Sequence, residues 1–211
     1  QSVAAARAKT FKPALIEASG NDPLIVMPSA PVAIAARGCA FAAFLNAGQV
    51  CTSAERIYVH ESVHDSFVRE LVTTAKSLRI GNGLGKVDMG PMVSDRERDR
   101  YERILGRAIQ QGAKVACGGG RPAGLNRGWF TDATVLTGVT ADMEIVNDES
   151  FGPVAPIVKV RDLDEAIELA NRSLFGLGAN IYTKDLSEAM RAVNEIQSGM
   201  GRAGTWFTIV E

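Results

Sequence analysis

Cys51 is the residue whose type and setting best suit chemistry, because it stands just past a glycine turn. The segment 44–51 ends an apolar, Ala-rich run that favours a helix, and Gly48-Gln49 then lead into the cysteine. This pattern predicts a thiol on a loop, with the small polar residues Thr52-Ser53 after it. An accessible, stabilised thiolate is a nucleophile, and rigid scaffolds usually present such groups on loops.

The other cysteines and the two histidines do not suggest a partner for this thiol. Cys39 falls within the apolar helix and Cys117 ends a strand, and both fit the common role of a small buried hydrophobe. His60 and His64 lie four residues apart around a helix start, which indicates a solvated pair rather than half of a Cys–His dyad. A base for Cys51 is therefore expected elsewhere.

Glu17 is the candidate base. It follows the apolar run 14–16, so the pattern places it at a strand end. A carboxylate there is partly desolvated, which raises its pKa towards values useful for proton transfer. A solvated acid at a strand end is the alternative that the residues alone leave open.

A third candidate segment, 149–154, reads Glu-Ser-Phe-Gly-Pro-Val. The carboxylate of Glu149 is a natural acceptor for vicinal hydroxyls. Taken alone, the segment also fits a β-turn with Phe151 in the core.

Together the segments 16–23, 44–51, 149–154 and 171–177 resemble the aldehyde dehydrogenase superfamily, in its order along the chain. Where most members read Leu-Gly-Gly after the acid, this chain has Ala18-Ser19-Gly20. The resemblance implies an α/β fold, a three-layer sandwich with a largely parallel sheet, of the catalytic-domain type. It covers nearly the whole chain, and the segment 171–177 within it is expected to be structural, a turn from a helix into a strand.

The resemblance also implies a reaction with NAD or NADP. Cys51 would attack an aldehyde to give a thiohemiacetal and then a thioester, and Glu17 would activate the hydrolytic water. Members that pass the acyl group to coenzyme A typically lack this glutamate. Glu149 and Phe151 would hold the nicotinamide ribose end of the cofactor, while Val50 and Thr52 would line the substrate pocket.

The elements that must position these residues alternate along the chain. Apolar runs predict strands, and periodic segments of ten or more residues predict helices, so the sequence indicates an α/β fold with a largely parallel sheet. Strands are predicted at 14–16, 24–27, 56–60, 114–117, 134–136, 154–160 and 177–182. Helices are predicted at 31–45, 61–78, 95–111, 163–170 and 186–196, with Asp162 as a cap.

Bulk composition narrows the function classes. The 211 residues carry a net charge of −1, which gives no support for binding nucleic acid or an anionic membrane. The apolar runs are too short to span a bilayer, and His and Cys do not cluster at metal-ligand spacings. Three irregularly spaced cysteines favour reduced thiols in the cytoplasm.

We expect residues 1–211 to form a single catalytic domain, and the resemblance places a nucleotide-binding domain before residue 1. The tail 199–211 is expected to depart from the family, since 198–200 starts like one motif and 201–204 continues like a later one. The expected partners are a small-molecule aldehyde, the missing domain and a second copy in a homo-oligomer. Two other readings stay open: a weak esterase that uses Cys51 and Glu17, and a non-catalytic oligomerisation module.

Overall fold

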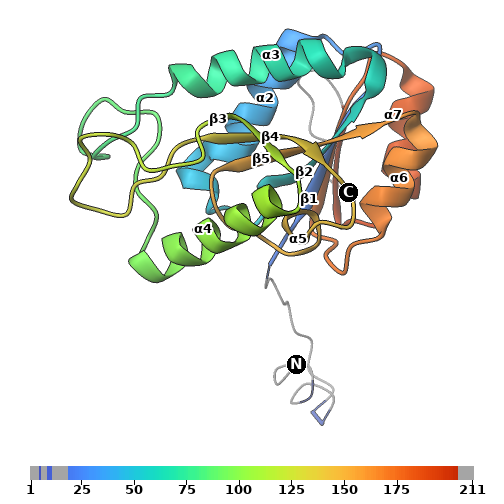
Figure 1. The fold of residues 1–211 in the computed structure, drawn as a ribbon. Helices are drawn as coiled ribbons and strands as arrows, with labels where there is room; N and C mark the ends of the chain where they lie inside the picture. The colour runs from blue at the N-terminus through green and yellow to red at the C-terminus, as the bar shows by residue number, and fades with distance from the viewer. Residues whose placement is uncertain (1–4, 6–8, 11–18, 204–211) are drawn as a thin grey trace.

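The computed structural model describes residues 5, 9–10 and 19–203, which contain a seven-stranded sheet (Figure 1). Its order is β3-β4-β5-β2-β1-β6-β7, and all neighbours are parallel except β3 and β4. The prediction of an α/β fold with a largely parallel sheet is confirmed. The strands are β1 (Asp22–Val26), β2 (Ala54–His60), β3 (Lys114–Cys117), β4 (Thr134–Val139), β5 (Val154–Val160), β6 (Gly178–Tyr182) and β7 (Met200–Ala203).

Helices cover both faces of the sheet, which makes three layers (Figure 1). From β1 to β2 the chain moves one way across the sheet, whereas from β5 through β6 to β7 it moves the other way. Right-handed crossovers therefore place α2 and α3 together on one face and α6 and α7 together on the other. The helical segments are α2 (Val32–Phe44), η1 (Leu45–Gly48), α3 (Glu61–Ser77), α4 (Asp95–Gln110), α5 (Glu144–Asn147), α6 (Leu163–Asn171) and α7 (Leu186–Glu195).

The central strands β1, β2 and β5 are buried along almost their whole length. Strands that helices cover on both faces need apolar residues on both sides, which is why these segments read as continuous apolar runs rather than alternating ones. The edge strand β3 pairs antiparallel with β4 and leaves Val115 41% exposed. The rigid part of the sheet is thus its centre, where β5, β2 and β1 lie side by side.

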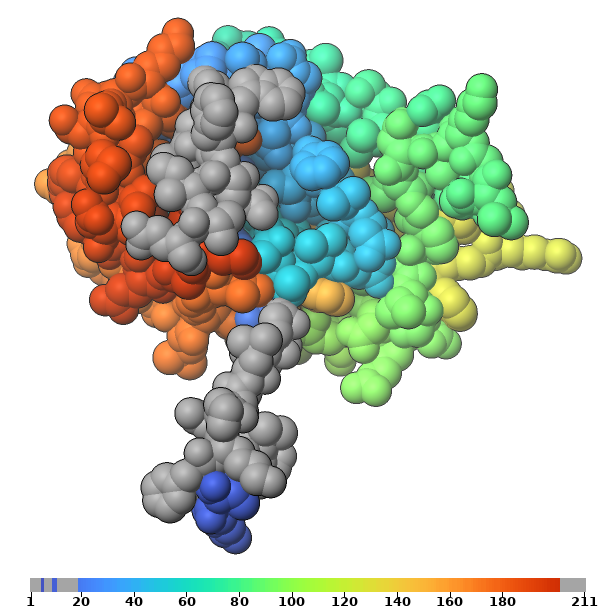
Figure 2. Space-filling view, turned by 180° about the vertical axis from the view of Figure 1, so that it is seen from behind, coloured from blue at the N-terminus to red at the C-terminus, as the bar shows by residue number. Residues whose placement is uncertain are grey.

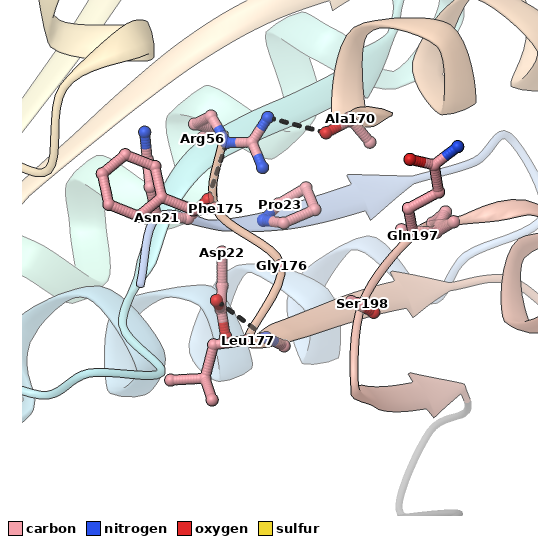
Figure 3. Close-up of a pocket in the computed structure, with 12 residues that line it drawn as sticks. Asn21, Asp22, Pro23, Arg56, Ala170, Phe175, Gly176, Leu177, Gln197 and Ser198 are labelled. Carbon is pink, nitrogen blue, oxygen red and sulfur yellow. Dashed lines mark hydrogen bonds between the residues drawn. The ribbon is translucent and has the colours of Figure 1, made fainter. Parts of the chain in front are cut away.

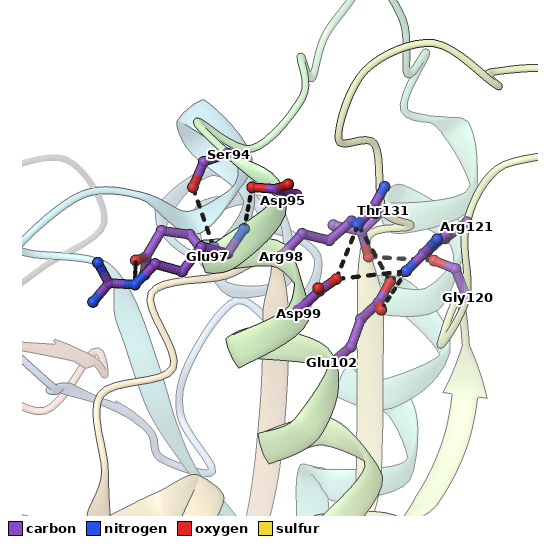
Figure 4. Close-up of polar contacts among 10 residues, drawn as sticks. Ser94, Asp95, Glu97, Arg98, Asp99, Glu102, Gly120, Arg121 and Thr131 are labelled. Atoms are coloured by element: carbon purple, nitrogen blue, oxygen red, sulfur yellow. Dashed lines mark hydrogen bonds and ion pairs between the residues drawn. The ribbon is translucent and has the colours of Figure 1, made fainter.

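Side-chain caps fix where several helices begin. Ser94 begins α4, and its Oγ accepts the Glu97 N–H at 3.2 Å (Figure 4). Asp162 caps α6 in the same way, as the sequence predicts, and Asp185 caps α7. Each cap satisfies backbone donors that the first helical turn leaves without partners.

Most predicted elements are confirmed to within a few residues, and three details differ. The helix predicted over 31–45 ends at Phe44 and continues as the 3-10 turn η1. The short helix α5 and the strand β7 were not predicted as elements. The predicted strand 14–16 and most of the tail 199–211 lie outside the described residues.

In the view from behind, α2 and the segment that follows it occupy the middle of the face, beside the Gly-rich connector 81–90 (Figure 2). Within the described residues, no helix is long and apolar enough to cross a membrane.

Candidate functional site

Cys51 lies in a tight turn at the amino end of β2. The Ser53 N–H donates to the Val50 carbonyl at 2.9 Å, so Cys51 and Thr52 occupy the two central positions of the turn. Cys51 is half-buried, and so are Val50 and Thr52 on either side of it. The prediction of a thiol on a loop, rather than within a helix or strand, is confirmed.

The chain reaches this turn through three successive left-handed residues. Asn46, Ala47 and Gly48 have φ values of 53°, 58° and 74°. An L-residue is sterically strained in this region, and Asn is strained less than most because its side chain can form hydrogen bonds to the nearby backbone. Here the Asn46 Nδ2 donates to the Gln49 carbonyl at 3.0 Å, and the Gln49 Nε2 donates to the Asn46 carbonyl at 2.8 Å. These bonds hold the unusual backbone that leads to the thiol.

Gly48 also packs against the segment before β5. A Cβ added at Gly48 would lie 2.1 Å from the Gly152 carbonyl oxygen, so only glycine allows this approach. The segment 149–153 therefore lies directly against the approach to Cys51. Phe151 within it is left-handed too, with φ at 48°.

Gly20, two residues before β1, joins these two segments. Its N–H donates to Glu149 Oε1 at 3.0 Å, and a Cβ added to it would lie 1.9 Å from the Cys51 carbonyl oxygen. Residues that are far apart in the sequence thus meet at the amino ends of β1, β2 and β5, three strands that are neighbours in the sheet. Open α/β sheets more often bind ligands at the carboxyl ends of their strands.

The predicted site residues therefore divide into two groups. The structure brings Cys51, its neighbours Val50 and Thr52, and the segment with Glu149 and Phe151 to one edge of the sheet. Glu17 lies outside the described residues, three positions before Gly20.

The histidines lie away from this edge. His60 ends β2 and caps α3, so the seven-residue strand separates it from Cys51 by roughly 20 Å. His60 therefore lies too far from Cys51 to act on its thiol. His64 pairs with Asp65 on α3 at 2.7 Å. Among the described residues no group of three or more His, Cys, Asp or Glu side chains could hold a metal ion.

The other two thiols are buried. Cys39 is 0% exposed within α2, and burial raises its pKa far above the usual range. Cys117 is 7% exposed at the end of β3, and burial raises its pKa as well. Because an ionised thiol is the reactive form, both are expected to be inert in the folded protein.

Two charged residues at the site were not found from the sequence. Glu55 is 2% exposed at the start of β2, and its carboxylate accepts the backbone N–H groups of Ser150 and Phe151. Burial raises the pKa of Glu55 to about 7, although the two N–H donors act to lower it. Arg100 of α4 donates to the carbonyls of Glu149 and Ser150. The adjacent charges Glu55-Arg56 at the start of an apolar strand were the available signal.

Arg56 points to the neighbouring hollow between β1, β6 and the end of α6 (Figure 3). Its Nε donates to the Asn21 carbonyl at 2.7 Å and its Nη1 to the Ala170 carbonyl at 3.0 Å. On the other side of this hollow, Asp22 Oδ1 accepts the Gly178 N–H at 3.0 Å. These bonds tie the amino ends of β1, β2 and β6 to one another and to α6.

The amino-acid sequence of this chain is similar to the sequences of known proteins. Residues 1–210 match the aldehyde dehydrogenase family. A protein named succinate-semialdehyde dehydrogenase (NADP(+)) from Mycobacterium avium (strain 104) is 40% identical over 200 residues, which are 94% of this chain and 42% of that protein.

Solved structures agree with that match. Betaine aldehyde dehydrogenase from Staphylococcus aureus, in complex with NAD+, has a TM-score of 0.92 and 31% identity over 99% of this chain and 42% of that one. A 3,6-anhydro-L-galactose dehydrogenase in complex with NAP has a TM-score of 0.92 and 38% identity, over 96% and 43% of the two chains. The chain thus spans less than half the length of these relatives.

Proposed function

This chain belongs to the aldehyde dehydrogenase family, and from that premise we propose that it forms the cysteine-bearing part of an enzyme that oxidises an aldehyde to a carboxylic acid with NAD or NADP. The observation that carries the proposal is the meeting of Gly20, Cys51 and Glu149 at one edge of the sheet. A nucleophile and a hydroxyl-binding carboxylate are thereby close enough to serve one substrate–cofactor pair.

Cys51 is the nucleophile. Its thiolate attacks the aldehyde carbon, a C–S bond forms, and the aldehyde oxygen takes the negative charge. The backbone N–H of Cys51 is a suitable donor to that oxygen. A thioester remains on Cys51 once the tetrahedral carbon has lost a hydride, and NAD or NADP, when bound, would supply the hydride acceptor.

Glu17 is the base of the second half of the reaction. It takes a proton from a water molecule whose oxygen attacks the thioester, so that the acid leaves and the Cys51 thiolate returns. Only two residues separate Glu17 from Gly20, so the chain limits the distance between their Cα atoms to about 11 Å. Since Gly20 touches Cys51, that length keeps the proposed base near the thioester.

The cofactor would be held at its nicotinamide end. Glu149 is half-buried, and the Gly20 N–H occupies one acceptor position of a carboxylate that has about four. It can therefore also accept hydrogen bonds from the vicinal hydroxyls of a ribose. Phe151 would pack beside that ribose, and Val50 and Thr52 would line the aldehyde side.

We assign the remaining catalytic and cofactor-binding residues to the part of the relatives' sequences that this chain does not match. We place residues 1–211 in a single catalytic domain that works with a nucleotide-binding domain for the adenosine end of the cofactor. The substrate class is a small-molecule aldehyde, in a reducing compartment such as the cytoplasm that keeps Cys51 as a thiol.

A second candidate role is assembly. Phe41 of α2 and Leu45, the first residue of η1, are four positions apart in the sequence and are 67% and 44% exposed, so they offer apolar surface for contact with another molecule. We propose that this surface contributes to a homo-oligomer. The molar mass in solution, measured by light scattering, would contradict this if it stays at 22.5 kDa at high protein concentration.

The function is tested by the rate at which iodoacetamide labels each cysteine, read by mass spectrometry as a function of pH. Cys51 is expected to label at least about tenfold faster than Cys39 and Cys117. Glu17→Gln is expected to change the pH profile, whereas the same change at exposed Glu70 should not. Slow, equal labelling of all three thiols would contradict a nucleophilic Cys51.

Catalysis without cofactor gives a second measurement. Cys51 and Glu17 together are expected to hydrolyse p-nitrophenyl acetate through the same acylated cysteine. Cys51→Ala should abolish that hydrolysis, and Cys39→Ala should reduce it far less. If the protein hydrolyses the ester but does not oxidise an aldehyde when NAD or NADP is added, the result would favour an esterase over a dehydrogenase.

A further inference from the structure

The backbone of the segment Glu149–Phe151 is held from both sides by opposite charges. The carboxylate of Glu55 accepts the Ser150 N–H on one oxygen and the Phe151 N–H on the other, the latter at 3.0 Å. The guanidinium of Arg100 donates to the Glu149 carbonyl at 2.6 Å and to the Ser150 carbonyl at 3.1 Å. Donors and acceptors of the same three residues are thus satisfied by side chains from β2 and α4.

Burying the Glu55 carboxylate away from water is energetically unfavourable. It is 2% exposed, and no described basic side chain forms an ion pair with it. An acid is almost never fully buried unless it is paired or strongly hydrogen-bonded. Its hydrogen bonds to Ser150 and Phe151 therefore take the place of water for the buried carboxyl.

We propose that Glu55 is a positioning residue that acts through Glu149, by holding the segment 149–151 in the geometry that directs the Glu149 carboxylate towards Gly20 and Cys51. The inference rests on the proposed function only for what Glu149 then binds. Glu55 acts through the backbone of Ser150 and Phe151, to which it is hydrogen-bonded.

The residue type follows from the geometry. Two backbone N–H groups converge on one side chain, so both of its terminal atoms must accept, which a carboxylate does and a carboxamide cannot. The bond to Phe151 also holds a residue whose φ of 48° is unfavourable for a bulky side chain. Without Glu55 the buried Ser150 N–H and the part-buried Phe151 N–H would lose this partner, and the segment would relax towards ordinary backbone angles.

Charged groups around Glu55 come from two directions. Glu149, on the segment itself, acts on it by charge repulsion and raises its pKa slightly, while Arg100 on α4 lies across the segment. Burial is the largest effect and brings the pKa to about 7. The two N–H bonds are strongest to the ionised carboxylate, so the segment should be held more tightly above that pH than below it.

The test is amide hydrogen exchange of this chain, followed by NMR and corrected for intrinsic rates. In wild type, protection of the Ser150 and Phe151 amides is expected to rise as the pH passes through about 7. In Glu55→Gln both amides should lose at least about tenfold in protection and the pH dependence should disappear. Amides of β5 and the control Glu70→Gln should stay within twofold of wild type.

Two results would overturn the proposal. One is unchanged protection of the two amides in Glu55→Gln, and the other is an equal loss throughout β5, which would indicate general loosening of the sheet. If Glu55→Gln does not fold, the wild-type protein still tests the proposal. The amide chemical shifts of Ser150 and Phe151 should then change with pH together with the titration of the Glu55 carboxyl, and shifts that do not change would overturn it. Slow labelling of Cys51 would count against the proposed function and leave this result unaffected.

Discussion

The Cα of Gly20 faces the carbonyl of Cys51 so closely that an added Cβ would lie 1.9 Å from the oxygen. The φ of Gly20 lies outside the left-handed region, so the constraint is one of space and not of backbone angle. The two nearest atoms, the oxygen and carbon of the Cys51 carbonyl, belong to the backbone, so neither can move away as the end of a flexible side chain could. The site therefore depends on a glycine that carries no chemistry of its own.

Gly20→Ala is expected to destabilise the protein by about 3 kcal/mol, because overpacking against backbone forces the chain to shift. For a domain of this size that lowers Tm by roughly 10 °C. Labelling of Cys51 should change as well, since the clash displaces its turn. The control is Gly106→Ala in α4, where an added Cβ meets nothing within 4 Å. It should raise stability by about 0.5–1 kcal/mol. Equal Tm values for the two variants would contradict the close approach.

Gln49 links the turn before Cys51 to the connector before α4. Its Nε2 donates to the Asn46 carbonyl, and its Oε1 accepts the Val93 N–H, both at 2.8 Å. Gln49→Glu keeps the acceptor but removes the donor, so we expect a loss of about 1 kcal/mol at neutral pH. The introduced carboxyl can donate again when it is protonated, so stability relative to wild type should recover below about pH 4. Urea unfolding at both pH values measures this. Gln49→Ala, which loses both bonds, should show no such recovery.

Local signals in the sequence were sufficient for the residues whose role depends on their neighbours in the chain. The glycine turn of Gly48 placed Cys51 on a loop, whereas the segment with Glu149 was identified by its resemblance to a motif of the family. Glu55 was missed because its two partners lie 95 and 96 residues away. Arg100 was missed for the same reason, since it reads as one charge among several on a solvated helix. The role of Glu17 stays a prediction.

The fold shows the same division. Long periodic helices and apolar strands were predicted within a few residues, whereas α5 has four residues and no room for a periodic pattern. The strand β7 depends on pairing with β6, which its own short sequence does not reveal. The side of the sheet that carries the site was also not predictable, because it depends on which strand ends become neighbours.

Arg56 is buried among backbone carbonyls and is expected to be irreplaceable by lysine. It is 3% exposed and reaches the carbonyls of Asn21, just before β1, and Ala170, in α6, with different nitrogens. A lysine offers one nitrogen and cannot span both positions. Arg56→Lys should therefore lower the free energy of unfolding by about 2–4 kcal/mol. Arg96→Lys, at a side chain that is 89% exposed, should stay within about 0.5 kcal/mol. An equal fall in the urea midpoint of Arg56→Lys and Arg96→Lys would contradict this role of Arg56.

The raised pKa of Glu55 predicts that the free energy of unfolding depends unusually on pH. Its pKa of about 7 in the folded protein lies above the ordinary value of 4.5, because burial disfavours the charged form. A group with a raised folded pKa stabilises the fold fully below its unfolded pKa and loses that contribution as the pH rises through the folded value. The contribution lost between about pH 4.5 and pH 7 is of the order of 3 kcal/mol. Glu55→Gln cannot titrate, so it should lack this loss.

The measurement is the difference in unfolding free energy between wild type and Glu55→Gln at several pH values, which cancels all other titrations. The wild-type advantage should shrink as the pH rises from about 5 to about 8. A constant difference would mean that Glu55 has an ordinary pKa. Over the same range the segment 149–151 should be held more tightly, because ionisation strengthens its hydrogen bonds. Global stability and local order at the site would then change in opposite directions with pH, which is expected of a residue that positions a site and not of one that only supports the fold.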